Sequence, residues 1–106
     1  MSAVSLSLHG LAQGGMQVVE LDGVEVVVVR TAEGVFAVDN LCSHAAEPLC
    51  NGRLKGNRLF CPLHGAAFDV RDGAALSRPA QKPLTSYPVT VEGDRVTVSM
   101  DSGSGP

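Results

Sequence analysis

The sequence predicts an all-β fold, built as a sandwich or barrel-like packing of small antiparallel sheets. Short segments rich in β-branched residues recur along the chain, and twelve glycines and six prolines punctuate them. No segment repeats its apolar residues at a convincing helical spacing, and Glu47–Asn51 could form one helical turn at most. Aromatic residues make up only 4% of the chain, so we expect an aliphatic core dominated by valine.

The clearest predicted element is a hairpin in the first third of the chain. Met16–Leu21 and Val24–Arg30 flank Asp22-Gly23, a dipeptide typical of two-residue hairpin turns. Val24–Val29 is almost pure valine, which favours a strand over a helix at this length. Further strands are expected at Val35–Asp39 after a turn at Thr31–Gly34, at Arg58–Cys61, at Ala67–Val70 before a turn at Arg71–Gly73, and at Val89–Val91 and Val96–Val98 around Gly93-Asp94.

Length and composition indicate one globular domain. The chain has 106 residues, 44% of them apolar, and we expect residues 1–100 to form a single domain with a flexible tail at 101–106. The net charge of −3 argues against binding to nucleic acid or to an anionic membrane. The N-terminus lacks the pattern of a signal peptide, and three cysteines form no disulfide-like framework, so a cytoplasmic location is expected.

Two short loops carry the chemistry that the sequence predicts. One contains Cys42 and His44, and the other contains Cys61 and His64. Each loop offers one thiolate and one imidazole at a spacing that lets both side chains point at a common centre. Two such loops side by side would supply four metal ligands.

Two metal centres could use this ligand set. A mononuclear zinc would take all four side chains in a closed tetrahedron. A 2Fe–2S cluster of the Rieske type would take two Cys on one iron and two His on the other. Zinc fingers usually pair Cys with Cys and His with His along the chain, whereas each loop here mixes the two, so the spacing favours the cluster without excluding zinc.

The sequence resembles the Rieske family over roughly residues 16 to 100. The two loops match its fingerprint, with sixteen residues between His44 and Cys61. The resemblance continues through Cys61–Gly73 and then through Pro79-Ala80, Pro83-Leu84 and Tyr87-Pro88-Val89. The chain is most similar in pattern to the soluble Rieske ferredoxins of bacterial aromatic-ring dioxygenase systems.

This resemblance implies a fold of three antiparallel sheets with one 2Fe–2S cluster at a tip between the two loops. The ligands it implies are Cys42, His44, Cys61 and His64. It also implies an electron carrier rather than an enzyme, with a flavin-dependent, NADH-oxidising reductase as donor and a terminal oxygenase as acceptor. Docking is expected at the side of the His ligands, near Leu63, Ala45, Ala46 and Pro79.

Departures from the family pattern predict a low reduction potential. Rieske proteins of respiratory complexes carry an extra disulfide at positions that match Glu47 and Leu63, neither of which can form one. They also place hydroxyl donors at positions that match Ala66 and Phe68. Without donors to its sulfurs, the cluster should have a potential on the order of −150 mV, the bottom of the Rieske range.

Two alternative functions are also compatible with the sequence. The small Rieske-like subunit of a nitrite reductase and a zinc-stabilised interaction module would each carry a similar pattern. Cys50 falls outside both loops and is interpreted as a small buried hydrophobe in the loop wall. His9 is interpreted as a surface residue without a metal role.

Overall fold

The fold was analysed in a computed structural model, which describes residues 3–41, 48–62, 66–76 and 83–100. Two short 3-10 turns, η1 (Leu8–Gly10) and η2 (Leu49–Asn51), are the helical elements of this described part. No helix in those ranges is long and apolar enough to cross a membrane. The strands are β1 (Ala3–Ser7), β2 (Met16–Leu21), β3 (Val24–Thr31), β4 (Gly34–Asp39), β5 (Arg53–Lys55), β6 (Arg58–Phe60), β7 (Ala67–Asp69), β8 (Ser86–Tyr87), β9 (Val89–Glu92) and β10 (Arg95–Ser99).

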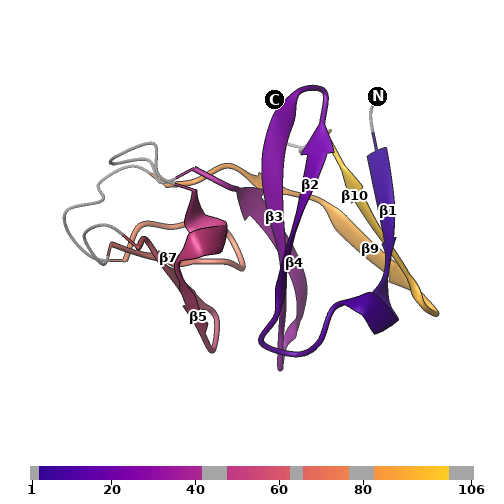
Figure 1. Ribbon diagram of the computed structural model, residues 1–106, viewed down its shortest axis with the longest axis horizontal. Helices are drawn as coiled ribbons and strands as arrows, with labels where there is room; N and C mark the ends of the chain where they lie inside the picture. The colour runs from indigo at the N-terminus through magenta and orange to yellow at the C-terminus, as the bar shows by residue number, and fades with distance from the viewer. Residues whose placement is uncertain (1–2, 42–47, 63–65, 77–82, 101–106) are drawn as a thin grey trace.

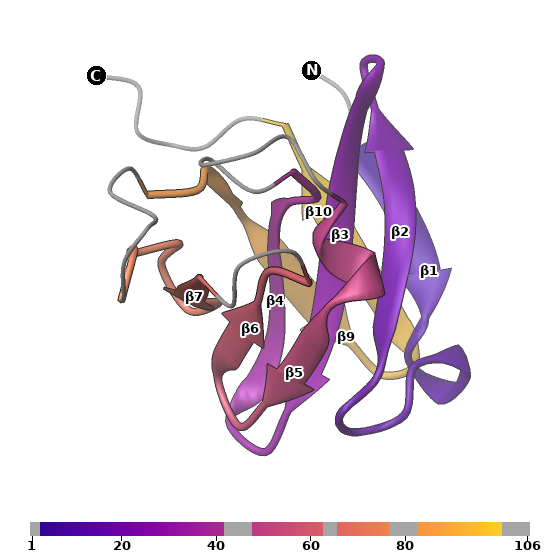
Figure 2. The same ribbon diagram turned by 60° about the vertical axis from the view of Figure 1, so that its left-hand side comes forward.

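The strands form three antiparallel sheets, as the family resemblance implied. The orders are β1-β10-β9, β2-β3-β4-β8 and β5-β6-β7. The four-stranded sheet lies between the other two in both views (Figures 1 and 2). We call the three sheets the closing sheet (β1-β10-β9), the central sheet (β2-β3-β4-β8) and the small sheet (β5-β6-β7).

Burial of β3 on both faces explains its run of valines. Val27 and Val29 belong to the core between the central and small sheets, with Leu59 and Phe68. On the opposite face, Val26 and Val28 pack in a second core with Val96 and Val98 of the closing sheet. All eight of these side chains are fully buried. A strand buried on both faces has a continuous run of apolar residues, whereas a strand with one exposed face alternates apolar and polar residues.

The predicted hairpin is confirmed. Met16 pairs with Val29 and Leu21 with Val24, around a turn in which Asp22 (φ 50°) and Gly23 (φ 81°) both have positive φ. Those angles are those of a type I′ turn, whose twist matches that of the paired strands. The next strand, β4, begins at Gly34, one residue earlier than expected, so the predicted turn at residues 31–34 is shorter.

The strands β1 and β8 were not predicted, and β5 lies within residues 45–60, where a hairpin-like stretch was expected without assigned strand bounds. β1 pairs with β10 through five register positions and β5 pairs with β6 through three, but β8 has only two residues. The first two are short and expose alternate residues, which leaves little apolar signal in the sequence. Where the sequence allowed one helical turn at residues 47–51, the described residues form the 3-10 turn η2.

The small sheet has one face buried and one face open to solvent. Leu59 pairs with Phe68, and both are fully buried against the central sheet, with Leu54 packed partly buried beside them. Because side chains alternate along a strand, Arg53, Lys55 and Arg58 project from the opposite face and are exposed.

A polar cluster ties the small sheet to the turn between β3 and β4. Arg71 Nη1 lies 3.3 Å from Glu33 Oε1, and Asn57 Nδ2 donates to Glu33 Oε2 at 2.7 Å. Arg71 also donates from Nη2 to Asp69 Oδ2 at 2.8 Å. Hydrogen bonding by Arg71 lowers the pKa of Asp69 below its usual value. Glu33 is thereby shared by two residues of the small-sheet region.

Asp94 anchors the end of β1 to the turn between β9 and β10. Its carboxylate accepts from the Ser7 hydroxyl at 2.7 Å and from the backbone N–H of His9 at 2.8 Å. The His9 ring also contacts Asp94 and is exposed, in agreement with its interpretation as a surface residue. The Ser7 hydroxyl, as the largest influence, lowers the pKa of Asp94.

The edge strand β8 is held to β4 by Asp39. The Tyr87 hydroxyl donates to Asp39 Oδ1 at 2.5 Å, and the backbone N–H of Thr85 lies 3.3 Å from Oδ2. Burial, followed by the hydrogen bond to Asp39, raises the pKa of the Tyr87 phenol well above its usual value. The folded protein therefore keeps this phenol protonated at pH values where an unfolded chain would lose the proton.

The pH titration of Tyr87 can be followed directly by ultraviolet absorbance, because the chain has one tyrosine and no tryptophan, and it tests the hydrogen bond to Asp39. The tyrosinate absorbance of the folded protein should stay low as the pH rises past about 10, the ordinary phenol value. Stability from the raised pKa is complete below that pH and is lost above it. Asp39→Asn, which removes the negative charge, should move the titration toward the ordinary value. A wild-type phenol that titrates near pH 10 while the protein is folded would contradict the assignment.

Candidate functional site

The described residues contain one of the four predicted metal ligands, Cys61. Cys42, His44 and His64 lie outside the described residues. Within residues 3–41, 48–62, 66–76 and 83–100, no group of three His, Cys, Asp or Glu residues is close enough to hold a metal ion. The site is therefore described from Cys61 and from the residues at which the two predicted loops begin and end.

Cys61 lies at the end of β6, where the chain leaves the small sheet. It is 2% exposed, belongs to the core between the small and central sheets, and is a free thiol. Its backbone N–H donates to the carbonyl of Ala66 at 2.7 Å. That hydrogen bond closes the base of the predicted second loop.

The base of the predicted first loop is closed in a similar way. Leu41 and Pro48 form an isolated antiparallel bridge. Immediately outside it, the backbone N–H of Leu49 donates to the carbonyl of Asn40 at 2.9 Å. The residues on either side of segment 42–47 are thus held together by backbone contacts.

The side chain of Asn40 reinforces this closure. Asn40 is a polar residue with only 1% exposure, and its Oδ1 accepts from the backbone N–H of Cys50 at 2.8 Å. Its Nδ2 donates to Glu25 Oε1 at 3.1 Å and lies 3.5 Å from the Cys50 sulfur. One amide therefore joins the end of β4, the start of β3 and η2.

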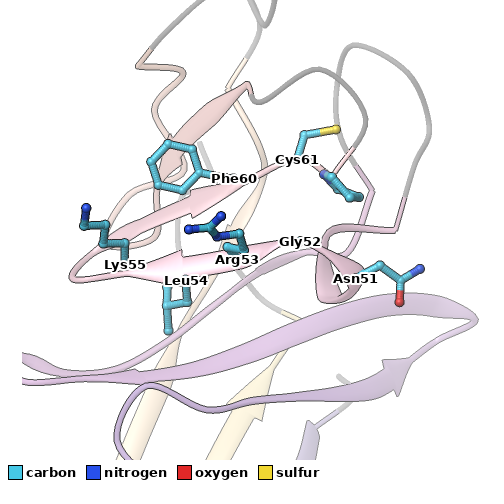
Figure 3. A pocket seen from close by; sticks show the side chains of 8 residues that line it. Asn51, Gly52, Arg53, Leu54, Lys55, Phe60 and Cys61 are labelled. Atoms are coloured by element: carbon cyan, nitrogen blue, oxygen red, sulfur yellow. The ribbon is translucent and has the colours of Figure 1, made fainter.

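Gly52 brings the end of the first loop region against the second. A Cβ atom at Gly52 would lie 1.8 Å from the carbonyl oxygen of Phe60, so a larger residue would push η2 away from β6. Asn51, Gly52 and Cys61 consequently line one pocket, shown in Figure 3. The residues that follow η2 therefore lie beside the end of β6, next to Cys61.

Cys50 differs slightly from its interpretation as a buried hydrophobe. It is half-buried and free, and it packs at the edge of the core that contains Cys61. Its place beside Asn40 agrees with a position in the wall of the first loop region.

The positions expected to lack hydroxyl donors are deeply buried. Ala66 and Phe68 both have no solvent exposure and lie in the same core as Cys61. The predicted docking positions Leu63, Ala45, Ala46 and Pro79 lie outside the described residues, as does Glu47. The chain on either side of segment 77–82 is anchored by hydrogen bonds from Leu76 N–H to Ala67 O (2.8 Å) and from Leu84 N–H to Gly73 O (2.7 Å).

The sequence pattern made Cys61 a candidate ligand but did not indicate the structural roles of Asn40 and Gly52. An Asn after a strand is usually part of an exposed turn, and nothing in the sequence marks this one as buried. Gly52 likewise looks like a turn glycine, and its close approach to Phe60 becomes visible only when η2 and β6 are both placed.

Comparison with known families identifies the fold independently. The model of the Rieske [2Fe-2S] domain matches residues 3–88. The match begins earlier than the sequence resemblance, since it includes β1, and it ends at residue 88 instead of near residue 100. The ferredoxin component of the naphthalene 1,2-dioxygenase system of Pseudomonas aeruginosa is 34% identical over 96 residues, covering 91% of this chain and 92% of the relative.

Solved structures agree with this result. The ferredoxin of carbazole 1,9a-dioxygenase from Nocardioides aromaticivorans IC177 superposes with a TM-score of 0.88 at 37% identity, covering 93% of this chain and 98% of that one. A chain from a complex of reduced oxygenase and oxidized ferredoxin in carbazole 1,9a-dioxygenase gives 0.86 at 28% identity, covering 92% of both chains. A protein from Mycobacterium tuberculosis named as an NADH-dependent nitrite reductase small subunit gives 0.81 at 23% identity, covering 92% and 95%, a likeness of fold alone.

Asn40 should be far more important to stability than its neighbour Asn51, which is exposed. Asn40→Ala leaves the Cys50 N–H without its acceptor and should lower the free energy of unfolding by about 2–3 kcal/mol. Asn51→Ala is the matched control and should change it by less than about 0.5 kcal/mol. Urea denaturation monitored by circular dichroism measures both. Equal effects of the two substitutions would contradict the role given to Asn40.

Proposed function

The chain belongs to the Rieske [2Fe-2S] domain family, and on that premise we propose that it is the electron-carrying ferredoxin of an aromatic-ring dioxygenase system. The observation that carries this proposal is the similarity to a naphthalene dioxygenase ferredoxin over nine-tenths of both chains. In this role the protein passes electrons between two partners and converts no organic substrate itself.

Its cofactor is one Rieske-type 2Fe–2S cluster, and we assign Cys42, His44, Cys61 and His64 as the ligands. The one described member of the set fits this role, because Cys61 is a free, buried thiol at the end of a strand. A thiolate and an imidazole from each loop match the two-Cys, two-His ligation of Rieske centres. When bound, such a cluster accepts and returns one electron at a time.

The surrounding residues hold the two loops and limit the polarity around Cys61. Asn40 fixes the base of the first loop, and the Cys61–Ala66 backbone hydrogen bond fixes the base of the second. Buried Ala66 and Phe68 bring no hydroxyl donor toward the site. An apolar wall without donors disfavours added negative charge, which supports a low reduction potential.

The partners in this proposal are a flavin-dependent reductase and a terminal oxygenase. A similar chain occurs in a complex of reduced oxygenase and oxidized ferredoxin, which supports the second partner. The reductase follows from the role, since the carrier must be reduced by a separate protein. We place the protein in the cytoplasm, where NADH is available to such a reductase.

The two alternative readings receive less support. The likeness to the nitrite reductase small subunit, at 23% identity, concerns the fold alone. Membership of a 2Fe–2S family argues against the zinc-stabilised module. Both alternatives can still be separated by experiment, since a zinc protein is colourless and a nitrite reductase subunit would copurify with a large catalytic subunit.

Alanine substitution at Cys42, His44, Cys61 or His64 should abolish cluster binding, because each removes a ligand. Iron and acid-labile sulfide content together with visible absorbance measures the effect. Cys50→Ala is the matched control, since Cys50 is also a free cysteine near the site, and it should retain the full iron and sulfide content. Loss of the cluster in Cys50→Ala with retention in Cys61→Ala would reverse the assignment.

The function itself is tested by reconstitution with a flavin reductase, NADH and a ring-hydroxylating oxygenase. Addition of the protein should couple NADH oxidation to product formation, and omission should stop it. A redox titration should place the midpoint on the order of −150 mV. A midpoint well above zero, or product formation that does not depend on the protein, would contradict the proposal.

A further inference from the structure

The charges of the chain are distributed very unevenly. Residues 48–82 hold six of the eight Lys and Arg residues but only two of the eleven Asp and Glu residues, a balance of +4. The rest of the chain has a balance of −7. Such separation within one small domain creates a dipolar field that can orient an approaching partner.

The structure places three of these cations on one face of the small sheet. Arg53 is paired with Phe60, and Lys55 is paired with Arg58. Directly opposed residues of antiparallel strands share a face, so all four side chains lie on the same side. Arg53, Lys55 and Arg58 are exposed, and Phe60 is half-buried. We call these four residues the basic face.

The basic face has few acidic neighbours within the described residues. None of the ion pairs found there involves Arg53, Lys55 or Arg58. Asp69 is opposite Arg58 in the sheet and feels its charge, but the Asp69 carboxylate is hydrogen-bonded and ion-paired to Arg71, which has the larger influence on its pKa. Lys55 and Arg58 are like charges placed directly opposite each other, an arrangement that destabilises a sheet. Folding alone does not explain this grouping.

The basic face extends to the metal site. Phe60 directly precedes Cys61, and Arg53, Phe60 and Cys61 line the same pocket. Figure 3 shows the side chains of Arg53, Lys55 and Phe60 on one side of the hairpin, with Leu54 pointing to the other. A protein seated on this face would have an aromatic ring and a proposed ligand immediately beneath its edge.

We propose that the basic face is the docking surface for a redox partner that presents a carboxylate-rich patch beside its own redox centre. The inference rests on the proposed function and adds the chemistry of the partner surface. Three exposed cations around one partly buried aromatic side chain provide long-range attraction and a short-range apolar contact. The acidic remainder of the chain repels the same partner and so disfavours other orientations.

The first test uses small inorganic oxidants, which report the charge of the surface through which the electron leaves. The reduced protein is mixed with anionic hexacyanoferrate(III) or cationic tris(phenanthroline)cobalt(III) in a stopped-flow instrument. If the electron leaves through the basic face, the rate with the anion falls as ionic strength rises, and the rate with the cation rises. The net negative charge of the protein acting as a whole gives the opposite signs, and that result would overturn the proposal.

The second test reverses charge on the face. Arg53→Glu combined with Lys55→Glu should slow electron uptake from the reductase, or delivery to the oxygenase, by about tenfold or more at low ionic strength. Arg95→Glu, an exposed cation of the closing sheet, is the control and should leave both rates unchanged. Visible spectra confirm that each variant is loaded, and the wild-type salt dependence remains decisive if the double variant does not fold.

The outcomes separate the two claims. A wild-type protein without a reducible cluster would refute the proposed function. A normal cluster whose two partner reactions are unaffected by charge reversal would refute only the basic face. If the reversal changes the sedimentation of the free protein instead of its electron transfer, the face is a contact between copies and the proposal is wrong.

Discussion

The whole architecture depends on one strand, β3, being buried on both faces. Val27 and Val29 hold the small sheet, while Val26 and Val28 hold the closing sheet. Complete burial of each valine contributes about 1.5–3 kcal/mol, so a polar residue at any of these positions would detach one layer. The position of the small sheet, and with it that of Cys61, follows from the alternation of these four side chains.

The end of β4 connects this buried layer to the predicted metal site. Asp39 and Asn40 are adjacent in the sequence, but their side chains make hydrogen bonds to different segments at the end of β4. Asp39 accepts hydrogen bonds from Thr85 and from Tyr87 of β8, whereas Asn40 accepts one from η2 and donates one to β3. A buried amide with all its hydrogen bonds made fixes one local conformation, because any displacement of the side chain would leave buried polar atoms without partners. The first ligand loop is predicted to start two residues after Asn40.

Much of the fold was predictable because its signals are local. Asp22-Gly23 specified a hairpin turn, and the valine run specified a buried strand. The short strands β1 and β8 escaped prediction, and the bounds of β5 were not predicted, because pairing partners determine these strands more than their own sequences do. At the site, loop chemistry makes Cys61 a candidate ligand, whereas Asn40 and Gly52 act through contacts with distant segments that a linear pattern does not contain. Cys42, His44 and His64 remain predictions, since they lie outside the described residues.

The grouping of cations on the small sheet also follows from the burial of the sheets. The buried sheets fix which side chains of the small sheet face outward, so Arg53, Lys55 and Arg58 are presented together as a consequence of the register.

The central claim is that two loops each give one thiolate and one imidazole to a shared diiron centre. Pulsed electron paramagnetic resonance of the reduced protein, prepared with ¹⁵N-labelled histidine, tests it most directly. The account predicts hyperfine coupling to two histidine nitrogens in the wild-type protein. A spectrum without nitrogen coupling, or no spectrum from protein containing stoichiometric zinc, would contradict it.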